Sequence, residues 1–70
     1  SKDIATARNV AMYIIREMTQ LSLAEIGQLF GGRHHTTVIN SINRVEKMMK
    51  EQPEVNEIIR DIINAVNSAY

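Results

Sequence analysis

Five consecutive polar residues near the middle of the chain, Arg33-His34-His35-Thr36-Thr37, are the side chains best suited to contact a partner molecule. The run contains no acidic residue, and the pattern around it predicts that it lies at the start of a helix. In a helix that binds DNA, this end enters the major groove, where side chains of the first turn reach the base edges. Exposed N–H groups at such a helix start also favour a phosphate. The run therefore indicates a candidate contact surface for DNA.

The segments on either side of this run predict a helix-turn-helix. A short helix of about nine residues is expected to begin at Ser22, because Ser22 and Glu25 have the spacing of a capping box. The break Gly31-Gly32-Arg33 ends it, and a longer helix follows. Gly27 lies inside the short helix, where glycine costs about 1 kcal/mol relative to alanine. We therefore expect Gly27 to permit a close approach of the following helix.

Helical spacing of apolar residues continues through the rest of the chain and predicts an all-α domain of about four helices over residues 1–70. The first helix is expected to begin after a cap at Asp3 and to reach Met18. The last helix is expected to have Pro53 at its first position. The expected buried positions after the first helix are Leu23, Ile26, Leu29, Phe30, Val38, Ile42, Val45, Met49, Val55, Ile58, Ile59, Ile62 and Val66.

Composition and charge narrow the class of protein. With 44% apolar and 23% charged residues, the chain has the balance of a soluble globular domain, and its longest apolar run, residues 10–15, is too short to cross a membrane. The absence of cysteine excludes a disulfide framework and a thiolate metal site. Residues 1–50 carry seven basic and four acidic side chains, whereas residues 51–70 carry one and four. This asymmetry indicates a basic working surface with an acidic appendage.

The stretch from Ser22 to Val38 resembles the signature of the carboxy-terminal domain of the DnaA family of bacterial replication initiators. The Ile26-Gly27 pair and the run from Phe30 to Val38 carry this resemblance. Upstream, residues 7–13 resemble that domain's Pro-Arg-Gln-hydrophobic-Ala-Met segment. The resemblance is dense over residues 6–50, and over 51–70 it extends only to an amphipathic helix. It implies sequence-specific binding of double-stranded DNA at the DnaA boxes of a replication origin.

The same resemblance implies roles for individual residues. Arg8 would enter an A·T-rich minor groove beside the helix-turn-helix. His35, Thr36 and Thr37 would contact bases in the major groove, partly through the threonine methyl groups against thymine methyls. Phosphate contacts, which set register without carrying sequence information, would come from Arg33, Arg16 and the backbone of Ser22-Leu23.

The chain departs from the family pattern at three positions and in its extent. His34 stands where the family usually has an aspartate, so we expect this DNA-contacting residue to relax selectivity at one base pair. Ala24 and Ala7 replace prolines. Because the family domain has further helices before residue 1, we expect the chain to be truncated on its N-terminal side.

Enzyme activity and metal binding are not expected. Adjacent helical residues point about 100° apart, so His34 and His35 chelate a metal poorly, and no cysteine or nearby carboxylate completes a site. The segment Gly31-Gly32-Arg33 lacks the Gly-Lys-Ser/Thr of a phosphate-binding loop. By resemblance, the parent initiator carries an ATP-binding AAA+ module that is absent here. No cofactor is therefore expected in this fragment.

One alternative stays open beside DNA binding: a helical protein–protein interaction module whose surface is formed by the four methionines and the acidic last helix. Methionines at helical spacing more often fill gaps in a core than line a binding groove. The resemblance implies a monomeric fragment that acts in the cytoplasm at the nucleoid, with double-stranded DNA as its partner and no membrane association.

Overall fold

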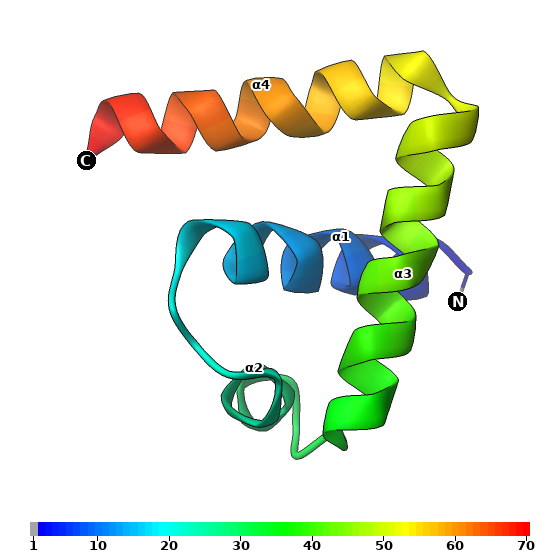
Figure 1. Cartoon of the computed structure of the whole chain (residues 1–70), viewed down its shortest axis with the longest axis vertical. Helices are drawn as coiled ribbons and strands as arrows, with labels where there is room; N and C mark the ends of the chain where they lie inside the picture. Colours follow the sequence, from blue (N-terminus) through cyan, green and yellow to red (C-terminus); the bar gives the residue numbers. More distant parts are fainter. Residues whose placement is uncertain (1) are drawn as a thin grey trace.

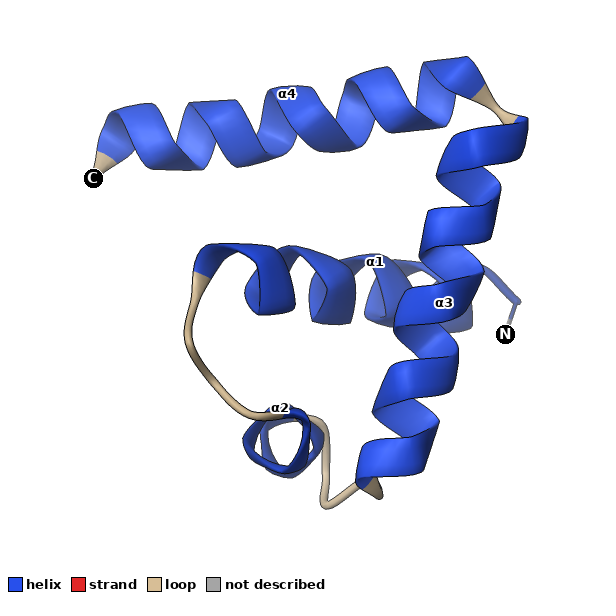
Figure 2. Ribbon diagram, viewed as in Figure 1, coloured by secondary structure: helices blue, strands red, loops and turns tan. Residues whose placement is uncertain are grey.

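The computed structural model describes residues 2–70, which form four α-helices and no strand (Figure 1). The helices are α1 (Lys2–Met18), α2 (Leu23–Leu29), α3 (His35–Glu51) and α4 (Pro53–Ala69). Two loops separate α1 from α2 and α2 from α3, and α3 is followed almost directly by α4 (Figure 2). The all-α prediction and the order of a short helix, a turn and a longer helix are thus confirmed.

Helix α3 is the element against which the other three helices pack. In Figure 1, α2 lies at the amino end of α3, α1 crosses its middle, and α4 begins at its carboxyl end. The centre of the core is fully buried and comes from three different helices: Met12 of α1, Ile26 of α2, and Val38 and Val45 of α3. The start of α3 is consequently held by a core that it shares with α1 and α2.

The starts of α1 and α4 agree only in part with the predictions. Pro53 occupies the first turn of α4, as predicted, where its missing N–H costs nothing. Asp3 does not precede α1, because the helix already includes Lys2, so the predicted cap at Asp3 is wrong. The Asp3 carboxylate lies instead in the first turn, where it is favoured by the positive end of the helix dipole.

Most of the predicted core is buried, but three positions are wrong. Leu29, at the end of α2, is 62% exposed, and Ile58 and Ile62 of α4 are 58% and 41% exposed. Ile59 is buried as predicted, with an exposed fraction of 2%, and Ile63, which was not predicted, is buried with an exposed fraction of 8%. Helix α4 carries two pairs of adjacent isoleucines, at 58-59 and 62-63. The helix is oriented so that the second isoleucine of each pair is buried.

In this orientation of α4, Arg60 faces α1 and contacts two of its side chains. Its Nη1 lies 3.6 Å from the Glu17 carboxylate on α1, and its Nη2 donates to the Tyr13 hydroxyl at 3.4 Å. The Tyr13 hydroxyl in turn donates to Glu17 at 3.2 Å. Burial raises the pKa of Tyr13, and the neighbouring Glu17 carboxylate raises it further. Burial of Ile59 and Ile63 contributes more to this orientation than the partly exposed ion pair does, and Ile58 and Ile62 are left facing solvent.

Candidate nucleic-acid interface

The turn between α2 and α3 is built around the backbone of Gly27. The Gly27 carbonyl accepts hydrogen bonds from the N–H of Phe30 at 3.1 Å and from the N–H of Arg33 at 2.9 Å. A β-carbon at position 27 would overlap the carbonyl oxygen of Arg33. The expected close approach is therefore real, but the group that comes closest belongs to the turn; on α3, the Val38 side chain would be 3.5 Å away.

The two glycines after α2 supply the backbone geometry that turns the chain back. Gly31 and Gly32 have φ angles of 82° and 78°, in the left-handed region that L side chains rarely adopt. This geometry confirms that the glycine pair ends α2, which covers seven residues and not about nine.

Helix α3 follows the predicted break closely. Its first residue is His35 and His34 is its N-cap, so Arg33 lies in the turn, as the break Gly31-Gly32-Arg33 predicted. The Nδ1 atom of His34 accepts a hydrogen bond from the backbone N–H of Thr36 at 3.1 Å. Residue-type preference did not indicate this cap, since serine, threonine, aspartate and asparagine are the usual N-caps. His34 is thus a positioning residue that the sequence patterns missed.

The predicted contact residues at this end of α3 are all accessible. Arg33, His34, His35, Thr36 and Thr37 are exposed, whereas the next residue, Val38, is completely buried. Val38 therefore anchors the first turn of α3 in the core while the preceding residues face solvent. The structure brings these five predicted residues together on one exposed end of the molecule.

The start of α2 carries the predicted capping box. The Ser22 Oγ accepts from the Glu25 N–H at 3.0 Å, and the Glu25 carboxylate accepts from the Ser22 N–H at 2.9 Å. These hydrogen bonds lower the pKa of Glu25, the backbone N–H of Ser22 contributing most. The Ser22 N–H is therefore used within the helix start. By helix geometry, the N–H groups of Leu23 and Ala24 lack an intrahelical acceptor and are the donors left for a phosphate.

Arg16 is exposed near the end of α1 and braces the loop that leads to α2. Its Nη1 donates a hydrogen bond to the Leu21 carbonyl at 2.9 Å. A guanidinium carries five N–H donors, so this bond leaves several of them for other acceptors. Arg16 thus lies beside the start of α2, which carries the predicted contact residues Ser22 and Leu23.

Arg8 lies apart from the helix-turn-helix, in the middle of α1, and is only half exposed. Its Nε is buried and has no hydrogen-bond partner in the described part of the chain, and the same is true of the Oδ1 of Asn9. An enclosed guanidinium N–H without an acceptor is costly, about 1–3 kcal/mol for such a group. Because this Nε is buried, it can meet an external acceptor only if the Arg8 side chain moves.

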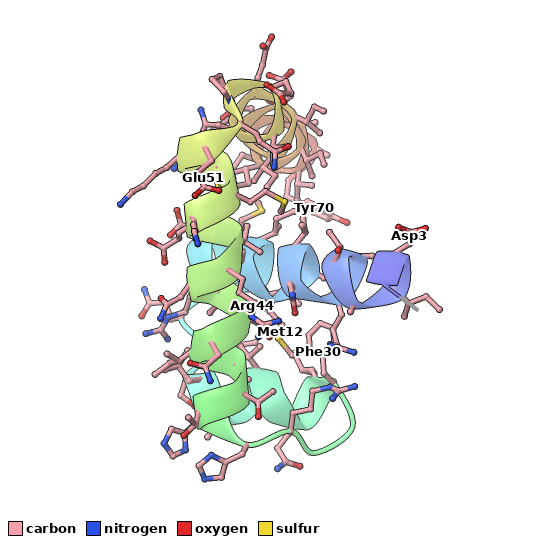
Figure 3. All side chains as sticks on the ribbon, turned by 90° about the vertical axis from the view of Figure 1, so that its right-hand side faces the viewer. Asp3, Met12, Phe30, Arg44, Glu51 and Tyr70 are labelled. Atoms are coloured by element: carbon pink, nitrogen blue, oxygen red, sulfur yellow. The ribbon has the colours of Figure 1, made fainter. Side chains whose placement is uncertain are left out.

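Charge is segregated along the molecule. The acidic residues Glu54, Glu57 and Asp61 are exposed on α4, which begins at the carboxyl end of α3. Figure 3 shows Glu51 at the upper end of α3 beside α4, whereas Phe30 lies at the lower end next to α2. The acidic helix is thus placed at the opposite end of α3 from the Arg33–Thr37 surface, where its carboxylates would not face a bound polyanion.

The methionines, the possible metal ligands and the helix lengths bear on the alternatives to DNA binding. Met12 and Met49 are buried and Met18 and Met48 are half-buried, so the methionines belong to the core as expected. Within residues 2–70, no three histidine, aspartate or glutamate side chains are grouped as a metal site requires. None of the helices described by the structure has the length and apolarity needed to cross a membrane.

Comparison with known proteins agrees with this architecture. A family model described as the bacterial dnaA protein helix-turn-helix matches residues 1–45. The chain is 44% identical over all 70 residues to the chromosomal replication initiator protein DnaA of Leifsonia xyli subsp. xyli. It is 45% identical over 64 residues, 91% of the chain, to the protein of the same name from Thermus thermophilus. In both cases the chain spans 15% of the relative's length.

The family match covers α1, α2 and most of α3, which are the elements that build and support the turn. The relatives extend the similarity to α4. Fold, turn geometry and sequence similarity lead to one conclusion: the chain belongs to the helix-turn-helix family of the bacterial DnaA protein.

Proposed function

We propose that this chain is a double-stranded DNA-binding module that recognises DnaA-box sequences at a replication origin. The observation that carries the proposal is the exposed, acid-free start of α3, held by a glycine turn and anchored by the fully buried Val38. In helix-turn-helix proteins the start of the second helix enters the major groove. His35, Thr36 and Thr37 are then the residues that contact base edges.

The other predicted residues fit the same arrangement. Arg33 in the turn and Arg16 beside the start of α2 supply phosphate contacts, which fix register and add salt-dependent affinity. At the predicted Ser22-Leu23 backbone site, the free donor is the Leu23 N–H, because the Ser22 N–H is bonded to Glu25. Arg8 enters the minor groove, as the family resemblance implies.

In this proposal the chain acts as a monomer, in the cytoplasm at the nucleoid, and forms the DNA-reading part of a replication initiator. The relatives are named chromosomal replication initiator proteins, which supports this role. ATP binding would belong to other parts of such an initiator.

The test is a fluorescence anisotropy titration with two duplexes of equal length and base composition, one carrying a DnaA box and the other the same bases scrambled. We expect tighter binding of the box duplex by at least about tenfold at a fixed salt concentration near 0.15 M. Glu57→Gln on α4 is the matched control and should leave the ratio of the two affinities unchanged. Equal affinity for the two duplexes would indicate a generic basic surface, and no binding to either would indicate a protein-interaction module.

A further inference from the structure

A row of apolar side chains runs along the part of α4 that the core does not cover. Ile58, Ile62, Val66 and Tyr70 are spaced by four residues, so each is the neighbour of the previous one on the helix surface. Ile58 and Ile62 are 58% and 41% exposed, Val66 is half-buried, and Tyr70 is fully exposed. Single exposed apolar residues need no explanation, but a contiguous apolar row on a surface marks an interaction site.

The row leads into a groove between the carboxyl ends of α1 and α4, which lie on the same side of the molecule in Figure 1. The groove has a volume of about 450 Å³ and a mostly apolar lining. Ile14, Ile15 and Met18 of α1 line it together with Val66 and Tyr70 of α4. The row and the groove therefore form one continuous apolar surface, which we call the α4 surface.

The charges beside the α4 surface are negative. Because successive helical residues are about 100° apart, Glu54, Glu57 and Asp61 fall on one flank of Ile58, and all three are exposed. Arg60, the only basic residue of α4, lies on the opposite side of the helix, where it contacts α1. An acidic flank of this kind repels DNA and anionic membranes, and a second copy of α4 brings the same charge.

We propose that the α4 surface is a docking site for an amphipathic helix of a partner protein, with apolar residues four positions apart and lysine or arginine along one flank. Apolar side chains at that spacing fit the row and the groove, as in other complexes in which a helix lies in a groove. The basic flank of the partner meets the three carboxylates of α4. The α4 surface lies away from the start of α3, so docking there leaves the Arg33–Thr37 surface accessible.

The test is an NMR titration of the isotope-labelled chain with a synthetic helical peptide of about 20 residues, long enough to cover the row. The peptide has leucines spaced by four residues and lysines along one flank. Amide shifts are expected at residues 58–70 and 14–18. A matched peptide with glutamate in place of every lysine should bind at least about tenfold more weakly. Raising NaCl to about 0.3 M should weaken binding of the lysine peptide, because salt screens the attraction.

Substitutions on the apolar row test the contact itself. Ile58→Gln and Ile62→Gln change side chains that face solvent, so both variants should melt close to the parent. Each is expected to weaken binding of the lysine peptide at least about fivefold. Leu29→Gln is the matched control, because Leu29 is 62% exposed but lies on α2, and it should bind the peptide as the parent does.

Substitutions on the acidic flank test the choice of partner. The combined change Glu54→Gln, Glu57→Gln and Asp61→Asn removes the negative charge and leaves the apolar row intact. In this variant the lysine and glutamate peptides are expected to bind with equal affinity. A preference for the lysine peptide that survived the change would overturn the proposed role of the carboxylates.

Other occupants of the α4 surface give different results. The absence of shifts at residues 58–70, or equal affinity of the parent for the two peptides, would overturn the proposal. A dimer of the parent that Ile62→Gln dissociates, measured by sedimentation equilibrium, would identify a second copy as the occupant and also overturn it. Sedimentation with phosphatidylglycerol vesicles that Ile62→Gln abolishes would do the same in favour of a membrane. None of these measurements uses DNA, so failure here leaves the proposed function untouched.

Discussion

An alanine at position 27 would place a methyl group against the carbonyl oxygen of Arg33, a backbone atom that cannot simply rotate away. The turn could relieve this overlap only by moving, and two hydrogen bonds, from the Phe30 and Arg33 N–H groups to the Gly27 carbonyl, oppose the movement. Overpacking of this kind costs about 2–3 kcal/mol and a weakened hydrogen bond about 1 kcal/mol more. Alanine regains about 1 kcal/mol of helix propensity. The net loss of unfolding free energy is therefore about 2–3 kcal/mol.

The assay is a thermal melt followed by circular dichroism at 222 nm, with chemical denaturation as a second measurement of the unfolding free energy. For a domain of this size the expected loss lowers the Tm by about 10–20 °C. The exposed neighbour Gln28 provides the matched control, since Gln28→Ala on the same helix should change stability by less than about 0.5 kcal/mol. If Gly27→Ala melted at or above the parent, the turn would not depend on this close contact and the reasoning would be refuted.

Four further predictions concern the capping box and the DNA surface. Ser22→Ala should lower the unfolding free energy by about 0.5–2 kcal/mol, measured by denaturation at pH 7. Because hydrogen bonds from Ser22 lower the pKa of Glu25, the stability that Glu25 contributes is present above the ordinary carboxyl pKa of 4.5. This stability is lost as the pH falls through the lowered pKa of Glu25. The Tm of Glu25→Gln should therefore decrease less between pH 7 and pH 3 than the Tm of the parent. If about six phosphates are contacted, log K should fall against log salt with a slope near −5, and a slope shallower than about −1 would contradict duplex binding. Thr36→Val should cost about 1–3 kcal/mol on the box duplex alone, whereas Arg16→Ala should weaken binding to every duplex about equally; selective loss of discrimination in Arg16→Ala would reverse the two roles.

The patterns in the sequence were sufficient for the helices and for the turn because each rests on local physical chemistry. The capping box at Ser22 and Glu25, the glycine pair after α2, and Pro53 at the start of α4 all depend on neighbouring residues only. The exposure of Thr36 and Thr37 follows from the helical spacing of the buried residues around them.

The errors arise where long-range contacts decide between local possibilities. Helix α4 carries adjacent isoleucines at 58-59 and 62-63, so its periodicity allows either stripe to face the core. The observed choice packs Ile59 and Ile63 into the core and brings Arg60 to Glu17 and Tyr13, which lie 43 and 47 residues earlier in the chain. No local pattern contains that information.

The cap at the start of α3 was missed for a different reason. Helical periodicity marks the buried face of a helix, but the exact first residue depends on which side chain caps it. Histidine is not among the preferred capping residues, so His34 did not stand out as the boundary. The consequence for function is direct, because Arg33 belongs to the turn and His34 positions the helix whose first turn contacts DNA in the proposed complex.

The central claim, that the start of α3 meets DNA while α4 faces away, is tested most directly by NMR. Backbone amide signals would be assigned in the free protein and followed through a titration with the DnaA-box duplex. The largest shifts are expected at residues 33–37 and at the start of α2, whereas the amides of Ile58 and Ile62, exposed on α4, should move little. Shifts centred on α4, with those of residues 33–37 unchanged at saturating DNA, would contradict the account.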